Sequence, residues 1–247
     1  MFRTAFTLLL LVATAQATDG GIRSAKVANA EGYERYKERK WQEATSLFRE
    51  AFTLEPKFAI AHYNFAATVF VSIREDGCEP SAPYAEGYDH LARSLQLDKR
   101  RLKRLAEDPD FEEFRHTAAY FHLIGDDVVS VAGITALLPK LRLEAPNSQD
   151  SGPLFQLEFH SDGTLVVLDN TIDNGSWKWV RRTGAWRVKP TVSDGGRAVL
   201  VEINAPAKGE FPALHYSGVV SAGRDGLSLT APPWPYFAAD GWGVCCC

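Results

Sequence analysis

The spacing of the apolar residues changes once along this chain of 247 residues, and that change limits the folds it can adopt. From about residue 22 to residue 122 apolar residues recur every three or four positions, which is the spacing of one helix face. After about residue 141 they alternate with polar residues, and Asp-Gly pairs separate the runs, as in strands joined by tight turns. We therefore predict an α+β fold, with a helical domain over residues 22–125 and an antiparallel β barrel or sandwich over residues 135–231. Residues 126–143 fit either half.

The first residues carry the pattern of an export signal. Arg3 precedes an apolar run that is too short to span a membrane and that is followed by the small-residue site Ala15-Gln16-Ala17. We predict a signal peptide over residues 1–17, cleaved after Ala17, which directs the protein to the periplasm or out of the cell. No later stretch approaches about 18 continuous apolar residues, so we predict no membrane span in the mature chain. The formal net charge of −4 argues against a protein that coats nucleic acid or anionic membranes.

Five residues of the helical half stand at a characteristic spacing: Gly32, Ala44, Phe48, Ala51 and Pro56. The small residues allow two helices to approach closely and Phe48 fills the space between them. Pro56 ends the second helix, because proline cannot continue the hydrogen-bond ladder. This spacing resembles the tetratricopeptide repeat (TPR), and a second repeat follows after about 34 residues. A generic helical hairpin is the competing interpretation.

A turn that follows these helices extends the resemblance. Asp108-Pro109-Asp110-Phe111 is similar to the closing segment of exported bacterial TPR proteins. Asp108 is expected to cap a short final helix and Pro109 to occupy its first turn. The resemblance covers about residues 28–122 and implies a groove that binds a peptide or protein partner, without any chemistry. The candidate groove residues are Tyr33, Tyr36, His62 and Asn64.

The β half resembles the lipocalin-like domains of exported bacterial proteins. The stretches FHSDGTL (residues 159–165) and GAWRV (residues 184–188) carry the resemblance, and the Asp-Gly turn supplies the positive φ of a tight hairpin. Further turns are predicted at residues 182–184 and 224–226. The resemblance implies an alternative function, the binding of a small apolar ligand in the barrel. The competing interpretation is a barrel filled by its own tryptophans, Trp177, Trp179 and Trp186. Trp177 and Trp179 share one face of their strand, which is either part of the core or an exposed aromatic patch.

No sequence pattern indicates catalysis. The six histidines lack metal-ligand spacing, and no nucleophile elbow, phosphate loop or dinucleotide-binding motif occurs. We therefore predict no enzyme activity, no metal and no cofactor. An enzyme whose acids and histidines converge only in three dimensions is the remaining alternative. The basic run over residues 99–104 is expected to be a solvated charged face at the end of a helix.

Cysteine occurs in two places. Cys78 lies in a polar loop, and three more cysteines end a tail, residues 232–247, that is predicted to be extended. In an exported protein this arrangement allows a disulfide within the tail, a bond to Cys78, a disulfide-linked dimer or a weak soft-metal site. The candidate disulfide residues are Cys78, Cys245, Cys246 and Cys247. Taken together, the sequence predicts an exported, non-enzymatic scaffold for a protein or peptide partner.

Overall fold

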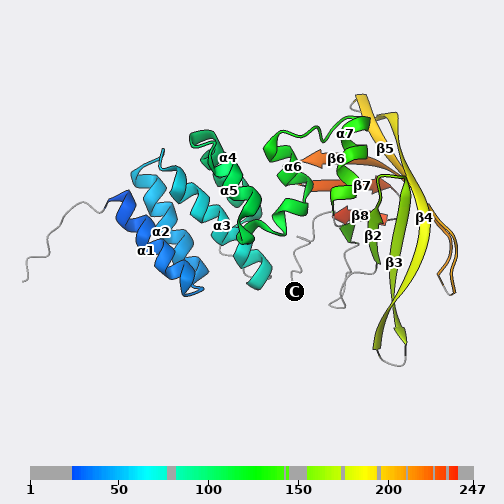
Figure 1. Ribbon diagram of the computed structural model, residues 1–247, viewed down its shortest axis with the longest axis horizontal. Coiled ribbons are helices and arrows are strands. Elements are labelled where there is room, and N and C mark those ends of the chain that lie inside the picture. Colours follow the sequence, from blue (N-terminus) through cyan, green and yellow to red (C-terminus); the bar gives the residue numbers. More distant parts are fainter. Residues whose placement is uncertain are drawn as a thin grey trace, which may run out of the picture.

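In the computed structural model the helices come first along the chain and the strands follow, which confirms the predicted mixture of a helical part and an antiparallel sheet (Figure 1). The structure describes residues 24–76, 82–141, 143–144, 155–173, 176–193, 196–209, 211–224, 226–231 and 234–238. The α-helices are α1 (Ala25–Lys37), α2 (Trp41–Leu54), α3 (Ala59–Asp76), α4 (Tyr84–Leu97), α5 (Arg101–Glu107), α6 (Ala118–Ile124) and α7 (Val131–Leu137), and the 3-10 turns are η1 (Pro109–Phe111), η2 (Phe114–His116) and η3 (Leu138–Lys140). The strands are β1 (Leu143–Glu144), β2 (Phe155–Phe159), β3 (Thr164–Asp173), β4 (Ser176–Ser193), β5 (Gly196–Ala205), β6 (Leu214–Gly223), β7 (Gly226–Ala231) and β8 (Trp234–Ala238).

Several predictions concern residues outside those ranges. They are the signal peptide with its cleavage site at Ala15 and Ala17, the loop cysteine Cys78, and the tail cysteines Cys245, Cys246 and Cys247. Within the described ranges, none of the helices combines the length and the apolar composition that crossing a membrane requires.

Helices α1 and α2 pack as the spacing of the five characteristic residues, from Gly32 to Pro56, predicts. Ala44, Phe48 and Ala51 are fully buried, and a β-carbon at Gly32 would lie only 2.8 Å from Phe48 Cε1. Glycine is therefore required for the close approach of the two helices. Helix α2 ends at Leu54, just before Pro56. This confirms the expected packing, whereas membership of the TPR family stays a prediction.

The second helical pair, α3 and α4, uses the same device. A β-carbon at Gly87 of α4 would lie 2.9 Å from Val69 Cγ1 of α3, so the two helices again meet at a glycine. Aromatic side chains from α3, η1 and η2 continue the core, because Phe70, Phe111 and Phe114 are fully buried and in mutual ring contact. The closing turn therefore packs against α3 and extends the core of the second helical pair.

The strands form one antiparallel sheet in which every strand pairs with its neighbours in sequence, from β1 to β8. The sheet is strongly curved, a half-barrel (Figure 1). The turn expected at residues 161–163 is present: Gly163 has a φ of 85° and joins β2 to β3. The turn expected at residues 224–226 also joins two strands, β6 and β7.

The turn expected at residues 182–184 is wrong, because β4 continues through it without interruption. Arg182 points into the sheet interior, where it pairs with Asp169. Gly184 lies where β5 comes close, since a β-carbon there would stand 2.1 Å from the Asn204 carbonyl oxygen. A charged residue and a glycine therefore resemble a turn in the sequence, although they serve long-range packing.

Helices α6 and α7 pack against the inner face of the sheet and share its core. Phe121 of α6 and Ile134 of α7 lie in one hydrophobic cluster with Trp186 of β4 and Ile203 of β5. This core therefore begins before residue 125, where the helical domain was expected to end. Because helix-derived side chains fill the inner face, it is not filled by tryptophans alone.

The three tryptophans expected inside a barrel have different environments. Trp186 is buried, as predicted, and its indole N–H donates to the His160 carbonyl oxygen at 2.9 Å. Trp179 is 42% exposed and lies on the outer face, so of the two alternatives the exposed one holds for Trp179 and the interpretation that places it inside the barrel is wrong. The side chain of Trp177 lies outside the described part of the structure.

Strand β8 falls within residues 232–247, the stretch expected to be a free extended tail. It is extended, but it pairs with β7, with Leu229 opposite Phe237. The first part of this stretch is therefore an edge strand of the sheet rather than a lead-in outside the fold.

Candidate functional site

Three of the four predicted groove residues lie on one face of the helical array, which we call the α1–α3 face (Asn29, Tyr33, Tyr36 and Asn64). Asn29, Tyr33 and Tyr36 follow each other at helical spacing on α1. The rings of Tyr33 and Tyr36 stack with centroids 6.0 Å apart, and Tyr33 remains 46% exposed. On α3, the Asn64 side-chain N–H donates to Asn29 Oδ1 at 3.1 Å. The face thus combines aromatic rings with paired amides.

The closing turn holds the far end of this face. Asp108 caps η1, as predicted, by accepting from the Asp110 N–H at 3.2 Å, and Pro109 occupies the first turn. The Tyr63 hydroxyl donates to Asp108 Oδ2 at 3.0 Å, and the Tyr36 hydroxyl hydrogen-bonds to Asp110. The closing turn therefore orients tyrosines from both α1 and α3.

The electrostatics of this turn keep the tyrosine hydroxyls protonated. Burial raises the pKa of Tyr36 and of Tyr63 well above the usual range, and the nearby aspartates raise both pKa values further. Burial also raises the pKa of Asp110, which the hydrogen bond from Tyr36 partly counteracts. Because protonated phenols donate hydrogen bonds, the two tyrosines remain hydrogen-bonded to the aspartates at neutral pH.

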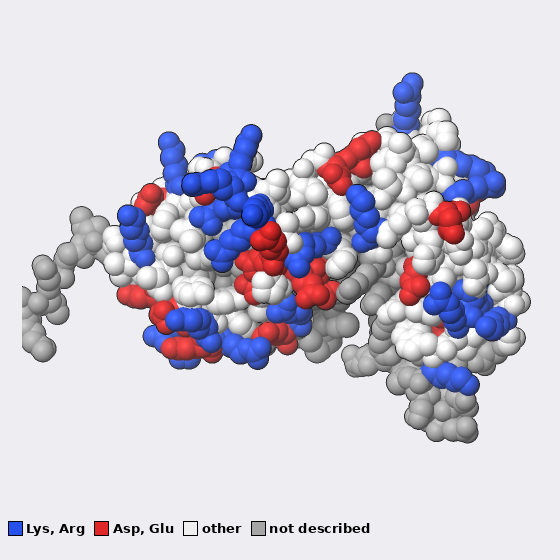
Figure 2. Space-filling model, in the orientation of Figure 1, with Lys and Arg blue, Asp and Glu red and all other residues white. Residues whose placement is uncertain are grey.

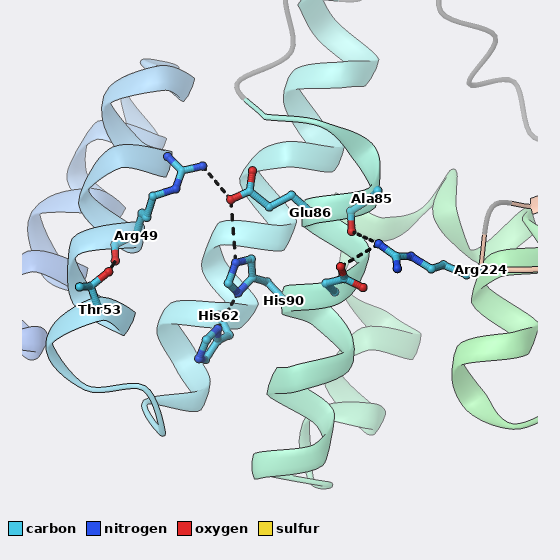
Figure 3. A network of polar contacts seen from close by, with 8 residues as sticks. Arg49, Thr53, His62, Ala85, Glu86, His90 and Arg224 are labelled. Carbon is cyan, nitrogen blue, oxygen red and sulfur yellow. Dashed lines mark hydrogen bonds and ion pairs between the residues drawn. The ribbon is translucent and has the colours of Figure 1, made fainter.

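His62, the fourth predicted groove residue, does not belong to the α1–α3 face. It is only 5% exposed and lies between α2 and α4, because two residues along a helix turn a side chain by about 200° from Asn64. There it meets His90 of α4 at an Nδ1···Nδ1 distance of 2.7 Å (Figure 3). The Phe52 ring of α2 stacks on both imidazoles.

The hydrogen bonds of this histidine pair fix its tautomers. His62 Nε2 lies 3.1 Å from the Pro56 carbonyl oxygen, so it carries the proton and its Nδ1 accepts. His90 Nδ1 must then donate to His62, which leaves His90 Nε2 without a proton, 4.0 Å from Glu86 Oε1. Glu86 is in turn paired with Arg49 of α2 at 2.8 Å (Figure 3). The neutral pair thus joins α3 to α4, and it contacts α2 through the stacked Phe52 ring.

A second polar contact in Figure 3 joins the two halves of the molecule. Arg224, at the β6–β7 turn, donates to Asp89 Oδ2 at 2.7 Å and to the Ala85 carbonyl oxygen at 3.2 Å. Its guanidinium also lies over the ring of Tyr88, whose hydroxyl is 2.8 Å from His122 Nδ1. The turn is therefore fastened to α4.

We expect the buried histidine pair to make stability depend on pH. Burial, and after it the neighbouring His62, lowers the pKa of His90 from 6.5 to about 4. The unfolded chain therefore takes up a proton before the folded chain does, so stability falls as the pH drops from about 6.5 to about 4. Allowing for solvent screening of this half-buried group, the loss is about 2 kcal/mol.

Urea unfolding of the wild type and of His90→Gln at pH 7 and at pH 4.5 measures this loss. The variant should lose less stability on acidification, whereas His160→Gln, which changes an exposed histidine, should behave like the wild type. Equal acid sensitivity of the wild type and His90→Gln would show that the pair does not titrate in this way.

Sequence reasoning missed the partners of the predicted residues. Asn29 stands 35 residues before Asn64, close to the repeat period, so a search for matching polar residues one period apart would have found it. No sequence pattern predicts the contact between His62 and His90, because this contact depends on the lengths of α3 and the following loop. Among the residues that the structure describes, no three of His, Cys, Asp or Glu come together as a metal site would require.

Comparison with protein-family models, with curated protein sequences and with solved structures finds no match for this chain.

Proposed function

We propose that this chain is an exported, non-enzymatic scaffold of TPR type that binds a peptide segment of a partner protein along the α1–α3 face. The observation that carries the proposal is the exposed Tyr33 ring, stacked on Tyr36 beside the Asn29–Asn64 amide pair. The two close-packed helical pairs that meet at Gly32 and Gly87 support the repeat architecture. The signal-like first residues support export.

The chemistry of this face suits a peptide. An extended peptide presents backbone N–H and C=O groups, and asparagine amides can donate to one and accept from the other. Tyrosine supplies a large contact area with little loss of side-chain freedom. Because the 108–110 turn holds Tyr36 in place, little ordering is needed when a peptide binds.

The inner face of the sheet favours this proposal over the small-ligand alternative. A carrier needs unfilled space among its inward-facing side chains. Against the described part of that face, Phe121 of α6 and Ile134 of α7 pack with Trp186 of β4 into one buried cluster. Apolar packing of this kind stabilises the fold and does not reserve a ligand site.

Peptide selection followed by binding measurements tests the proposal. Peptides selected from a displayed library on the full exported chain should bind Tyr33→Ala about tenfold more weakly, as expected for a tyrosine at the centre of an interface. Asn64→Ala should also weaken binding, whereas Trp179→Ala, which removes an exposed aromatic on the outer sheet face, should change affinity less than about twofold. Selected peptides that bind Tyr33→Ala and the wild type equally would refute the proposal.

A further inference from the structure

Helix α5 carries its charges in the order that opposes its own dipole. Three of its first four residues are cations and it ends in Glu107, whereas a helix dipole favours acids at the start and bases at the end. The basic run over residues 99–104 was predicted to lie at the end of a helix. That prediction is wrong, because α4 already ends at Leu97 and the run leads into a new helix, α5. Charges that oppose local stability point to a functional role.

A shallow, open depression of about 480 Å³ lies beside these cations. Figure 2 shows Lys and Arg side chains gathered over the α4–α5 region, with carboxylates gathered next to them. An open depression of this kind admits the side chains of a segment that lies across it. It is lined by Arg100, Lys103, Arg104, Glu107, Asp108 and Pro109.

The positive charge of this region is only partly neutralised. Arg100 pairs with Asp98 at 2.8 Å, but its side chain is 91% exposed, and such exposed pairs are weak. Lys99 and Lys103 are exposed and form no ion pair with any residue in the described ranges. These cations are therefore free to meet carboxylates of another molecule.

The region is also continuous with the α1–α3 face. Arg104 pairs with Asp108 at 3.2 Å and lies over the ring of Tyr63, 5.1 Å from its centroid. Tyr63 of α3 donates to Asp108, and Asp108 belongs to the turn that also holds Tyr36. The turn that hydrogen-bonds to Tyr36 of the α1–α3 face thus also pairs with Arg104 of α5.

We infer that the α5 basic patch (Lys99, Arg100, Lys103 and Arg104) binds an acidic stretch of the partner's polypeptide, next to the part that lies on the α1–α3 face. The inference rests on the proposed function and adds the chemistry of the partner. Carboxylates of Asp or Glu meet exposed ammonium and guanidinium groups there, and Arg104 supplies a planar donor pair for one of them.

A polypeptide fits this patch better than a nucleic acid or a membrane does. The carboxylates of Glu107 and Asp108 line the same depression as the cations, and Glu112 and Glu113 are exposed a few residues further along the chain. A continuous polyanion would be brought against these carboxylates, whereas a peptide can place its acids over the cations alone. The whole chain is also acidic, which weakens the attraction of extended polyanions.

Fluorescence anisotropy with labelled 12-residue peptides tests the inference on the full exported chain. The probes are alternating Glu-Gly and Lys-Gly peptides, with single-stranded DNA and phosphatidylglycerol vesicles as comparison ligands. At low salt the wild type should bind the Glu-Gly peptide at least about tenfold more tightly than the Lys-Gly peptide. Arg100→Glu combined with Lys103→Glu should remove or reverse this preference. The matched control, Lys57→Glu combined with Arg197→Glu, changes two exposed cations outside both surfaces, one in each half of the molecule, and should retain it.

Three results would overturn the inference: no preference of the wild type for the acidic peptide, equal losses in the test and control variants, or equally tight binding of DNA or vesicles through the same two residues. The variant Tyr33→Ala separates the inference from the proposed function. Because Tyr33 lies outside the α5 basic patch, its loss should leave binding of the Glu-Gly probe within about twofold of the wild type, while it weakens the library-selected peptides.

Discussion

Replacing Arg182 by alanine is expected to lower the free energy of unfolding by about 3–5 kcal/mol, because it leaves Asp169 as a buried, unpaired charge. Both side chains are less than 10% exposed, and the guanidinium meets the carboxylate through two nitrogens, with Nη2 donating to Oδ1 at 2.8 Å. Arg182 Nη1 also donates to the carbonyl oxygens of Pro206 and Pro212, at 3.2 and 2.6 Å. One substitution therefore leaves four acceptor oxygens without their donor.

Urea unfolding followed by tryptophan fluorescence measures this loss, with Arg187→Ala as the matched control. Arg187 lies on the same strand and pairs with Glu202, but it is exposed, so its removal should cost less than about 1 kcal/mol. The double variant Arg182→Met/Asp169→Leu should recover much of the stability, since it leaves no charge behind. If Arg182→Ala and Arg187→Ala were equally stable, the buried pair would contribute nothing beyond a surface contact.

The same ion pair shows where sequence reasoning fails in the β half. Arg182 and Asp169 are paired across neighbouring strands, and nothing in the local pattern around either residue reveals the other. Without that knowledge, a charged residue followed by a threonine and a glycine indicates a turn. The turn at Gly163 was predictable because its cause is local, namely a positive φ between two alternating runs.

The helical half was easier to predict because its determinants lie within one hairpin. The spacing of Ala44, Phe48 and Ala51 specifies which side of α2 faces α1, and the structure buries all three. For the candidate site, the aromatic stripe of α1 was predictable from the same spacing. His62 was predicted to lie in the groove together with Asn64. The two residues are two positions apart on α3, which places their side chains on nearly opposite sides of the helix.

The loss of Phe48 should have the second large effect, with Phe48→Ala lowering the free energy of unfolding by about 3–5 kcal/mol. Phe48 is fully buried between α1 and α3, and alanine leaves a cavity that two rigid helices cannot close. Leu54→Ala on the same helix removes a side chain that is 46% exposed and should cost less than about 1 kcal/mol.

A double-mutant cycle tests whether Gly32 and Phe48 form one packing unit. Gly32→Ala improves helix propensity by about 1 kcal/mol, but its β-carbon would lie 2.8 Å from Phe48 Cε1, so the variant should be destabilised overall. In the Phe48→Leu background the ring is absent and the added methyl group gains space. Gly32→Ala should then be neutral or stabilising, with a coupling of about 1–3 kcal/mol between the two sites. If the two substitutions changed the free energy of unfolding additively, a β-carbon at position 32 would not clash with the Phe48 ring. The close approach of α1 and α2 would then need another cause.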